Sequence, residues 1–297
     1  MKGAGFASAG SRMTSAFIDK LLAAERAHDS LLCVGLDPEP AKFPGAWQHD
    51  PARIFDFCAT IVDATRDLVL AFKPQIAHFA ANRAEDQLER LMAHIRKAAP
   101  QVPVILDAKR GDIGSTAEQY AREAFERYQA DAVTLSPYLG YDAIEPYMKY
   151  DGKGLILLCR TSNLGAADLQ GQRLDNGMAL YEHIAHLAQG EWNHTGQLGL
   201  VVGATAAAEI ARVRAAAPTL PLLIPGVGAQ GGDAEAAVLA GWRERDGRTT
   251  GPIIVNSSRA VLYASRGNEF AAAARQVALD TRALLNRARR TRTARQA

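Results

Sequence analysis

The chain has 297 residues, of which 48% are hydrophobic and 22% are charged, and its formal net charge at pH 7 is +2. This is the composition of an ordinary globular protein, and the near-neutral charge argues against a body built to bind nucleic acid. No run of eighteen or more apolar residues occurs, so the sequence predicts no membrane span. Cys33, Cys58 and Cys159 are far apart and form no CxxC pair, which favours buried thiols in a reducing cytoplasm over a disulfide or zinc framework.

The two ends of the chain differ in composition from its body. Residues 1–14 are rich in small residues and contain no apolar signal core, so we predict a disordered extension there. Residues 286–297 are strongly basic, and such a run is typical of a solvated, frayed tail. Residues 15–285 are left as one predicted catalytic domain.

Eight short apolar runs recur along this body. Each run is almost continuously apolar, as expected for a parallel strand that is covered on both faces. The runs are Leu31–Asp37, Leu68–Pro74, Val102–Lys109, Ala132–Leu135, Leu155–Cys159, Gly199–Val202, Leu222–Ile224 and Ile253–Val255.

The segments between the runs are long enough for helices. The patterns predict helices over Ser15–His28, with Ser15 as its N-cap, over Asp50–Asp67 and over Ala84–Ala99. A further helix is predicted over Ser115–Tyr128, because Ser115 and Glu118 have the spacing of a capping box. Segments 162–197 and 231–251 are longer than one crossover needs, so they are expected to carry extra helices or active-site loops.

Eight strand–helix units with one strand character predict an α/β fold, a single (β/α)₈ TIM barrel. An open doubly wound sheet also alternates strands and helices. That fold more often carries a glycine-rich fingerprint after its first strand, whereas Gly35 here is followed by Asp37 and Pro38. The sequence therefore favours the barrel.

In a barrel, functional side chains lie at the carboxyl ends of the strands. Polar residues stand at or just beyond the ends of most of the predicted strands, namely Asp37, Lys73, Asp107, Lys109, Ser162, Gln230 and Arg259. Because these strand ends meet at one rim, we expect a single site there.

The third run ends in Asp107-Ala108-Lys109-Arg110-Gly111-Asp112. Residues i and i+2 of a strand share a face, so Asp107 and Lys109 are expected to point the same way. Charges are rarely buried unless they are paired. Two interpretations stay open: a structural ion-pair network that includes Lys73, or a set of charges arranged for a substrate.

A glycine-rich segment, Gly226–Gly232, follows the seventh run, and Ser257-Ser258-Arg259 follows the eighth. In barrels the loops after strands seven and eight often bind phosphate through backbone N–H groups, and an arginine can add a bidentate contact. Glycines that serve only to turn the chain are the alternative.

Other candidate positions carry weaker signals. On local sequence alone, Asp37 and Ser162 could equally be cap or turn residues. His183 and His186 are three residues apart with no third ligand in view, so no metal site is predicted.

Taken together, these motifs resemble the orotidine 5′-phosphate decarboxylase family, in its longer bacterial branch (type 2). The resemblance rests on Gly35–Pro38, Phe72–Gln75, Asp107–Ile113, Pro225–Gly232 and Arg259, which follow the family's order and span most of the chain. It implies a TIM barrel that converts orotidine 5′-monophosphate to UMP, the last step of de novo pyrimidine synthesis, in the cytoplasm. It also implies that no metal or other cofactor takes part and that neither nucleic acid nor membrane is a partner.

The resemblance also implies roles for individual residues. Lys73, Asp107, Lys109 and Asp112 match an alternating tetrad in which the lysine at 109 stabilises and protonates a carbanion at C6 of the pyrimidine. The last aspartate of the tetrad reaches into the partner subunit's site, so a homodimer is expected. The implied substrate-binding positions are Asp37, Ile113, Thr116, Ser162, Pro225, Gln230, Ser258 and Arg259, with Ile113 and Thr116 also contributed by the partner.

Two other functions remain open at this stage. A magnesium-dependent sugar-phosphate enzyme of the same barrel superfamily shares the DxKxxD core but would need an acidic metal ligand where this chain has Lys73. A catalytically silent nucleotide-binding barrel is the other. It is disfavoured because a pure binder gains little from two aspartates that face an anionic ligand.

Overall fold

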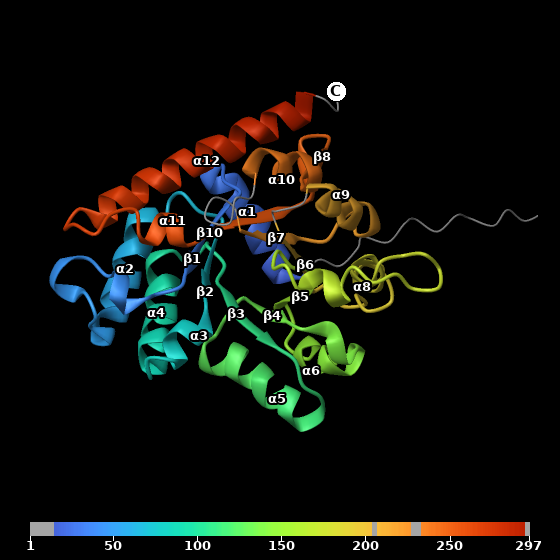
Figure 1. The fold of residues 1–297 in the computed structure, drawn as a ribbon, viewed down its shortest axis with the longest axis horizontal. Helices are drawn as coiled ribbons and strands as arrows, with labels where there is room; N and C mark the ends of the chain where they lie inside the picture. Colours follow the sequence, from blue (N-terminus) through green and yellow to red (C-terminus); the bar gives the residue numbers. More distant parts are fainter. Residues whose placement is uncertain (1–14, 204–206, 227–232, 295–297) are drawn as a thin grey trace, which may run out of the picture.

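A barrel of parallel strands forms the centre of the computed structural model, which describes residues 15–203, 207–226 and 233–294 (Figure 1). Within these residues, eight strands are hydrogen-bonded in the order β2-β1-β10-β7-β6-β5-β4-β3. Parallel bridges between Phe72 and Val104 and between Gln75 and Asp107 join the two ends of this order. The predicted (β/α)₈ barrel is therefore confirmed.

Each barrel strand falls on one of the predicted apolar runs. The strands are β1 Leu32–Leu36, β2 Ala71–Pro74, β3 Ile105–Arg110, β4 Ala132–Leu135, β5 Gly154–Arg160, β6 Leu198–Val202, β7 Leu222–Pro225 and β10 Ile253–Ser257. Every residue of β1, β6 and β10 is buried, which explains why these runs lack the polar alternation of a half-exposed strand.

An antiparallel hairpin, β8 Arg243–Arg245 and β9 Arg248–Gly251, occupies part of the long segment before β10. Extra helices or loops were expected there. The two residues of its turn, Asp246 and Gly247, both have positive φ. An Asp-Gly pair is a strong signal for such a turn, so the hairpin could have been predicted from the sequence.

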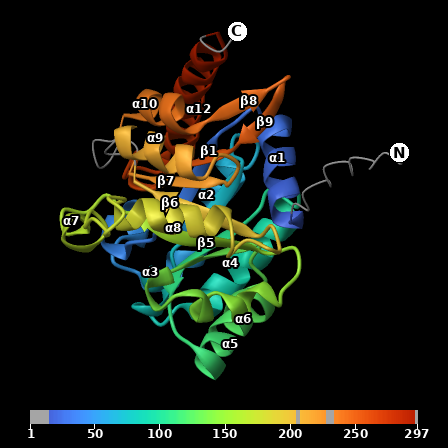
Figure 2. The ribbon, with the colours of Figure 1, turned by 90° about the vertical axis from the view of Figure 1, so that its right-hand side faces the viewer.

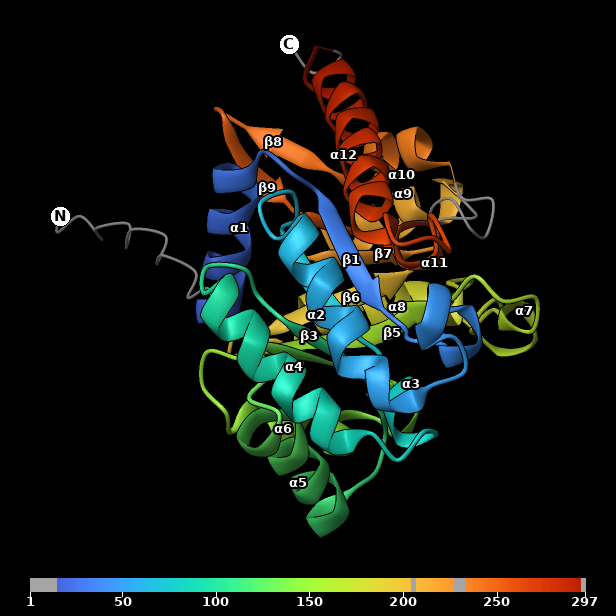
Figure 3. The same cartoon turned by 90° about the vertical axis from the view of Figure 1, so that its left-hand side faces the viewer.

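Helices surround the barrel (Figure 3). They are α1 Ala16–His28, α2 Ile54–Thr65, α3 Ile76–Ala80, α4 Glu85–Ala98, α5 Gly114–Arg122, α6 Glu145–Met148, α7 Ala166–Leu169, α8 Leu180–Gln189, α9 Ala207–Ala216, α10 Ala234–Gly241, α11 Arg259–Leu262 and α12 Phe270–Ala294. Ser15 caps α1 as predicted, accepting a hydrogen bond from the Ile18 amide at 3.4 Å. In the described part of the chain, no helix is both long and apolar enough to cross a membrane.

The predicted capping box at Ser115 is wrong. Helix α5 begins one residue earlier, at Gly114, after Ile113, which makes no side-chain cap hydrogen bond. Ser115 therefore lies inside the first turn, where its side chain is not placed to cap the helix. The α-helical part ends at Arg122, and a π-helical turn over Glu123–Arg127 continues the helix to the expected end near Tyr128.

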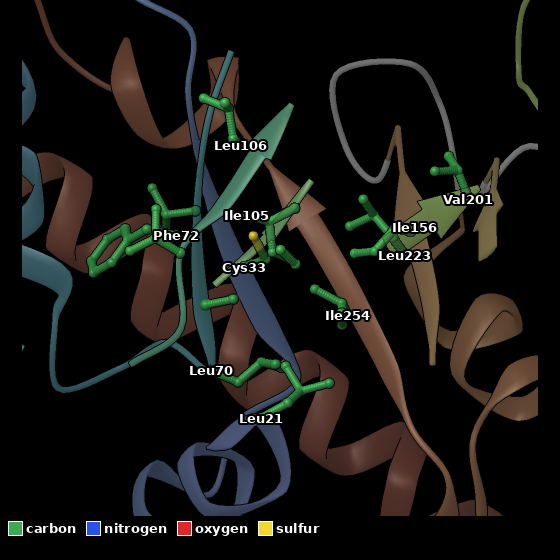
Figure 4. Close-up of a cluster of buried hydrophobic side chains, with 14 of the residues drawn as sticks. Leu21, Cys33, Leu70, Phe72, Ile105, Leu106, Ile156, Val201, Leu223 and Ile254 are labelled. Atoms are coloured by element: carbon green, nitrogen blue, oxygen red, sulfur yellow. The ribbon is translucent and has the colours of Figure 1, made fainter. Parts of the chain in front are cut away.

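Apolar side chains from different strands fill the interior of the barrel. Figure 4 shows Cys33, Ile105 and Ile254, from β1, β3 and β10, among this cluster, and all three are fully buried. Cys33, Cys58 and Cys159 are free and buried. Burial raises the pKa of the Cys33 thiol to about 12, so this group remains a protonated, apolar part of the core at neutral pH.

The basic segment that begins at residue 286 differs from the frayed tail that was expected. Helix α12 continues through it to Ala294 and packs along α2 and α10 (Figures 1 and 3). Asn286 is buried and donates a hydrogen bond to the Asp29 carbonyl at 2.7 Å, and the Arg289 guanidinium pairs with the Asp29 carboxylate. These contacts with Asp29, the residue that follows α1, hold the segment in place. Residues 1–14, and 295–297 at the end of the expected tail, lie outside the described residues.

Glu25 links α1 to this region. Its carboxylate accepts hydrogen bonds from Trp242 Nε1 at 3.4 Å and from Thr249 Oγ1 at 2.8 Å, and Arg289 Nη1 lies 3.6 Å away. Figure 2 shows the β8–β9 hairpin beside α1. Burial raises the pKa of Glu25 above its ordinary value, although these partners oppose the shift.

The raised pKa of Glu25 predicts a pH dependence that Glu25→Gln removes. Since the folded protein holds this proton more tightly than the unfolded chain, the stabilisation is full below the ordinary pKa of 4.5 and is lost as the pH rises through the folded pKa. The free energy of unfolding of the wild type relative to E25Q should therefore decline from pH 4 towards neutrality.

Urea unfolding of the two proteins across this range measures the difference. Glu191→Gln, at an exposed position, is the control and should show no such trend. A difference between wild type and E25Q that is constant or grows with pH would contradict the assignment.

Candidate active site

A buried carboxylate, that of Asp107 on β3, lies between two ammonium groups. Its Oδ2 is 2.7 Å from Lys73 Nζ and its Oδ1 is 2.6 Å from Lys109 Nζ. Asp107 and Lys73 are only 6% and 4% exposed, respectively, whereas the Lys109 side chain is 46% exposed. The structure thus brings together three of the four tetrad positions within one chain.

The neighbouring charges stabilise the ionised forms of the buried pair. Burial by itself raises the pKa of Asp107, but the ammonium groups of Lys73 and Lys109 hold it well below its usual range. Burial by itself lowers the pKa of Lys73, but the carboxylates of Asp107 and Asp37 raise it above its ordinary value. The pair is therefore ionised at neutral pH.

Closure of the barrel places Lys73 beside Asp107. Lys73 lies on β2 and Asp107 on β3, and the bridge between Gln75 and Asp107 joins these two strands. Beyond Asp107 the strand is irregular: its register with β4 shifts between Leu106 and Arg110, and Lys109 has a φ of 48°. Asp107 and Lys109 share a side, as expected, but along a distorted strand end.

Thr134 on β4 was missed by the sequence analysis. Its hydroxyl donates to Asp107 Oδ1 at 2.9 Å and accepts hydrogen bonds from the amides of Ala108 and Lys109 at 3.0 Å each. It stood in the sequence as one member of an apolar run. The available signal was a lone hydroxyl residue in a strand whose neighbours, Val133 and Leu135, are apolar.

Asp112, the fourth tetrad position, does not join the other three within this chain. Its Oδ1 accepts a hydrogen bond from the Ile113 amide at 2.9 Å, and among the described residues no salt bridge of Asp112 is present. Ile113 is 54% exposed, and Thr116, in the first turn of α5, is exposed too. Ile113 and Thr116 therefore lie on the surface, and Asp112, between them and β3 in the sequence, is partly buried.

Asp37 follows β1 on the side of Lys73, whose pKa its carboxylate raises. Its Oδ1 is buried without a hydrogen-bond partner among the described residues. Its carbonyl accepts a hydrogen bond from the Tyr263 hydroxyl at 2.9 Å, and that hydroxyl also accepts from the Glu39 amide at 2.7 Å. Tyr263, which the sequence analysis also missed, stacks on Phe57 with ring centroids 5.9 Å apart.

The predicted phosphate-binding positions follow β7 and β10. Pro225 ends β7, and Gly226 has a φ of 96°, a conformation that favours glycine. Ser258 follows β10 and accepts a hydrogen bond from Asn256 Nδ2 at 3.1 Å. Arg259 begins α11 and is exposed. Gln230 and the rest of the glycine-rich loop lie outside the described residues.

Close packing of β1 on β10 explains one glycine of the Gly35–Pro38 motif. A Cβ at Gly35 would collide with the Ser258 side chain and crowd Asn256. Ser162, after β5, has a comparable glycine neighbour. A Cβ at Gly203, which follows β6, would lie 2.8 Å from the Ser162 Cβ. Ser162 is therefore close to the end of β6, on the same rim.

Chemically, the cluster offers a half-exposed ammonium beside a carboxylate that stays ionised. Such fixed charges stabilise a developing negative charge without having to reorganise. In the described part of the chain, no group of three or more His, Cys, Asp or Glu side chains has the arrangement of a metal site.

Comparison with known proteins identifies the family. Residues 30–276 match the model of the "Orotidine 5'-phosphate decarboxylase / HUMPS family". The chain belongs to this family. The prediction that it is an enzyme of a decarboxylase family is thereby confirmed.

Individual relatives agree along almost the whole chain. The chain is 74% identical over 276 residues to the orotidine 5′-phosphate decarboxylase of Methylibium petroleiphilum, and the match covers 92% of this chain and 99% of that protein. It is 40% identical to the solved OMP decarboxylase of Leishmania donovani, with a TM-score of 0.75 over 92% of this chain and 99% of that one. The UMP synthase of the same organism matches with 40% identity and a TM-score of 0.78, and the match covers 92% of this chain and 57% of the synthase.

The buried pairing predicts that Asp107→Asn destabilises the protein by about 3 kcal/mol, because Lys73 loses the carboxylate that compensates its burial. The double variant Lys73→Met/Asp107→Asn should recover most of this loss, since no buried charge is then left unpaired. Urea unfolding at pH 7 measures both effects.

Asp67→Asn is the matched control. Asp67 pairs with Arg275 on the surface, where an ion pair contributes at most about 1 kcal/mol. Equal destabilisation by D107N and D67N would contradict the importance of burial at Asp107.

Proposed function

We propose that this protein decarboxylates orotidine 5′-monophosphate to UMP without a metal or other cofactor, with Lys109 stabilising and protonating the C6 carbanion. The observation that carries the proposal is the alternation Lys73–Asp107–Lys109, with contacts of 2.7 and 2.6 Å around one buried carboxylate. The names of the bacterial and Leishmania donovani relatives support the choice of substrate.

The chemistry requires electrostatic stabilisation. When the bond from C6 to the carboxylate breaks, its electron pair stays on C6 in an in-plane orbital that the ring π system cannot delocalise, and CO₂ leaves. The Lys109 ammonium is a fixed positive charge beside this developing carbanion. It then transfers a proton from Nζ to C6, and solvent reprotonates the amine. One proton is consumed for each CO₂ released.

Asp107 and its other neighbours keep Lys109 in place. Asp107 lies beside the position of the departing carboxylate, and its two lysine contacts keep it ionised. Lys73 holds the far oxygen of Asp107. Asp112, supplied by a second subunit, completes the alternation of charges around Lys109.

The remaining rim residues bind the parts of the substrate that do not react. Asp37 has a buried oxygen, Oδ1, that can accept a hydrogen bond from a ribose hydroxyl. Ser162 is assigned to the pyrimidine and Gln230 to the pyrimidine and the phosphate. Arg259, with Pro225 and Ser258 beside it, holds the phosphate. Binding energy from this remote dianion can then be used in the transition state.

A homodimer fits the surface beside Asp112. Ile113, Tyr138 and Leu139 are 54%, 73% and 50% exposed. Their loops are in contact, because a Cβ at Gly111 would lie 3.1 Å from the Ser136 Cβ. Exposed apolar residues that gather at one place are typical of an interaction site. For the reaction's location we propose the cytoplasm, which the three free, buried cysteines support.

Ultraviolet absorbance of orotidine 5′-monophosphate tests the proposed activity. In excess EDTA the wild type should convert the substrate to UMP at its full rate, and Lys109→Ala should lose at least about a thousandfold in kcat. Lys97→Ala, at an exposed position on α4, is the control and should retain full activity.

Two outcomes would reject this proposal. Turnover that appears only when magnesium is added would favour the sugar-phosphate type of enzyme. Tight binding of orotidine 5′-monophosphate without turnover would favour a silent nucleotide-binding barrel.

The shared site predicts complementation between inactive variants. Lys109→Ala and Asp112→Ala are mixed under mildly unfolding conditions and then refolded together, so that about half of the dimers are hybrids. Each hybrid has one intact site of its two, so the mixture should regain about a quarter of the wild-type activity. Each variant refolded alone is the control. If Asp112 acted within its own subunit, the mixture would stay as inactive as its components.

A further inference from the structure

We propose that Thr134 is a positioning residue for this reaction, a role that rests on the proposed function. Its hydroxyl fixes the backbone of Lys109 and the carboxylate of Asp107 at the same time. Thr134 itself is buried on β4, and its hydroxyl bonds to Asp107 and to the backbone of Ala108 and Lys109, so it acts through them and not on the substrate.

The hydroxyl of Thr134 uses its full hydrogen-bonding capacity on the cluster. It donates to Asp107 Oδ1 at 2.9 Å and accepts from the amides of Ala108 and Lys109, each at 3.0 Å. A hydroxyl has one proton and two acceptor positions. Because Thr134 is buried, no exchange with bulk water competes with these three bonds.

The backbone of Lys109 needs such support. Its φ of 48° lies in the left-handed region, which is unfavourable for a residue with a side chain. The ladder between β3 and β4 is also interrupted between Leu106 and Arg110. The amides of Ala108 and Lys109 therefore use the Thr134 side chain as acceptor where a regular strand pair would use a backbone carbonyl.

The contacts form a closed ring of interactions. Asp107 Oδ1 accepts from Thr134 Oγ1 and from Lys109 Nζ, and Thr134 Oγ1 in turn accepts from the Lys109 amide. One hydroxyl thus sets both where the Lys109 side chain starts and which oxygen its ammonium meets. Without this hydroxyl, the Lys109 amide loses its acceptor and the carboxylate that pairs with the Lys109 ammonium loses a donor.

Another buried threonine supplies a matched comparison. Thr65 on α2 is as completely buried as Thr134, and its hydroxyl donates to the Ile61 carbonyl one turn earlier at 2.7 Å. This is a local helix contact. Thr65→Val and Thr134→Val make the same chemical change, the replacement of a buried hydroxyl by a methyl group.

Steady-state kinetics with orotidine 5′-monophosphate tests the role. For Thr134→Val, kcat should fall on the order of a hundredfold while KM changes little, because a small displacement of the reacting group affects the transition state most. Thr134→Ser, which restores the hydroxyl, should return kcat to near the wild-type value. Thr65→Val should leave kcat unchanged.

Hydrogen exchange gives a second readout that does not depend on activity. The amides of Ala108 and Lys109 should exchange faster in Thr134→Val than in the wild type and in Thr65→Val. If the wild type does not decarboxylate the substrate, the proposed function fails, and this measurement still tests the support of the backbone.

Three results would overturn the role of Thr134. The first is a kcat for Thr134→Val within about threefold of the wild type, because misplacement of Lys109 should cost far more. The second is an equal loss of kcat in Thr65→Val. The third is unchanged protection of the Ala108 and Lys109 amides from hydrogen exchange in Thr134→Val. The first of these results, if a rise in KM accompanied it, would mean a role in substrate binding only.

Discussion

The ionised carboxylate of Asp107, held inside the barrel wall, is the constraint on which the site depends. An unpaired charge at 6% exposure would be strongly unfavourable. Two ammonium groups and one hydroxyl donate hydrogen bonds to its oxygens. Lys73 can reach it only because the barrel closes between β2 and β3. Fold closure and charge pairing therefore support each other, and the half-exposed Lys109 is the member of the group that remains available to a substrate.

The sequence predicts the parts of this arrangement that depend on short-range pattern. Continuous apolar runs mark strands that are covered on both faces, and the rule that strand ends share a rim brings Lys73, Asp107 and Asp37 to one place. The spacing of two residues between Asp107 and Lys109 predicts that they share a side, and they meet at 2.6 Å. These inferences succeed because they depend on the periodicity of a strand and the topology of a barrel.

The features that were missed depend on contacts between distant segments. Thr134 reads as a strand residue until the register shift of β3 turns two amides towards it. Helix α12 continues past residue 286 because Arg289 pairs with Asp29, which is 260 positions away in the sequence. Local composition predicts a frayed end there, since it contains no information about these partners. Asp246-Gly247 was a different kind of miss, because its turn signal is local.

Contacts between the segments that follow β1 and β10 connect the proposed phosphate-binding side of the site with its charged cluster. Arg259 begins α11 and Tyr263 directly follows its last residue, with the Tyr263 amide donating to the Arg259 carbonyl at 3.1 Å. The Tyr263 hydroxyl in turn donates a hydrogen bond to the Asp37 carbonyl at 2.9 Å, and the Asp37 carboxylate raises the pKa of Lys73. A substrate phosphate held by Arg259 would therefore be linked through Tyr263 and Asp37 to the buried charges of Lys73 and Asp107. In the proposed reaction, this geometry would connect the phosphate-binding side of the site to Lys73 and, through Asp107, to Lys109.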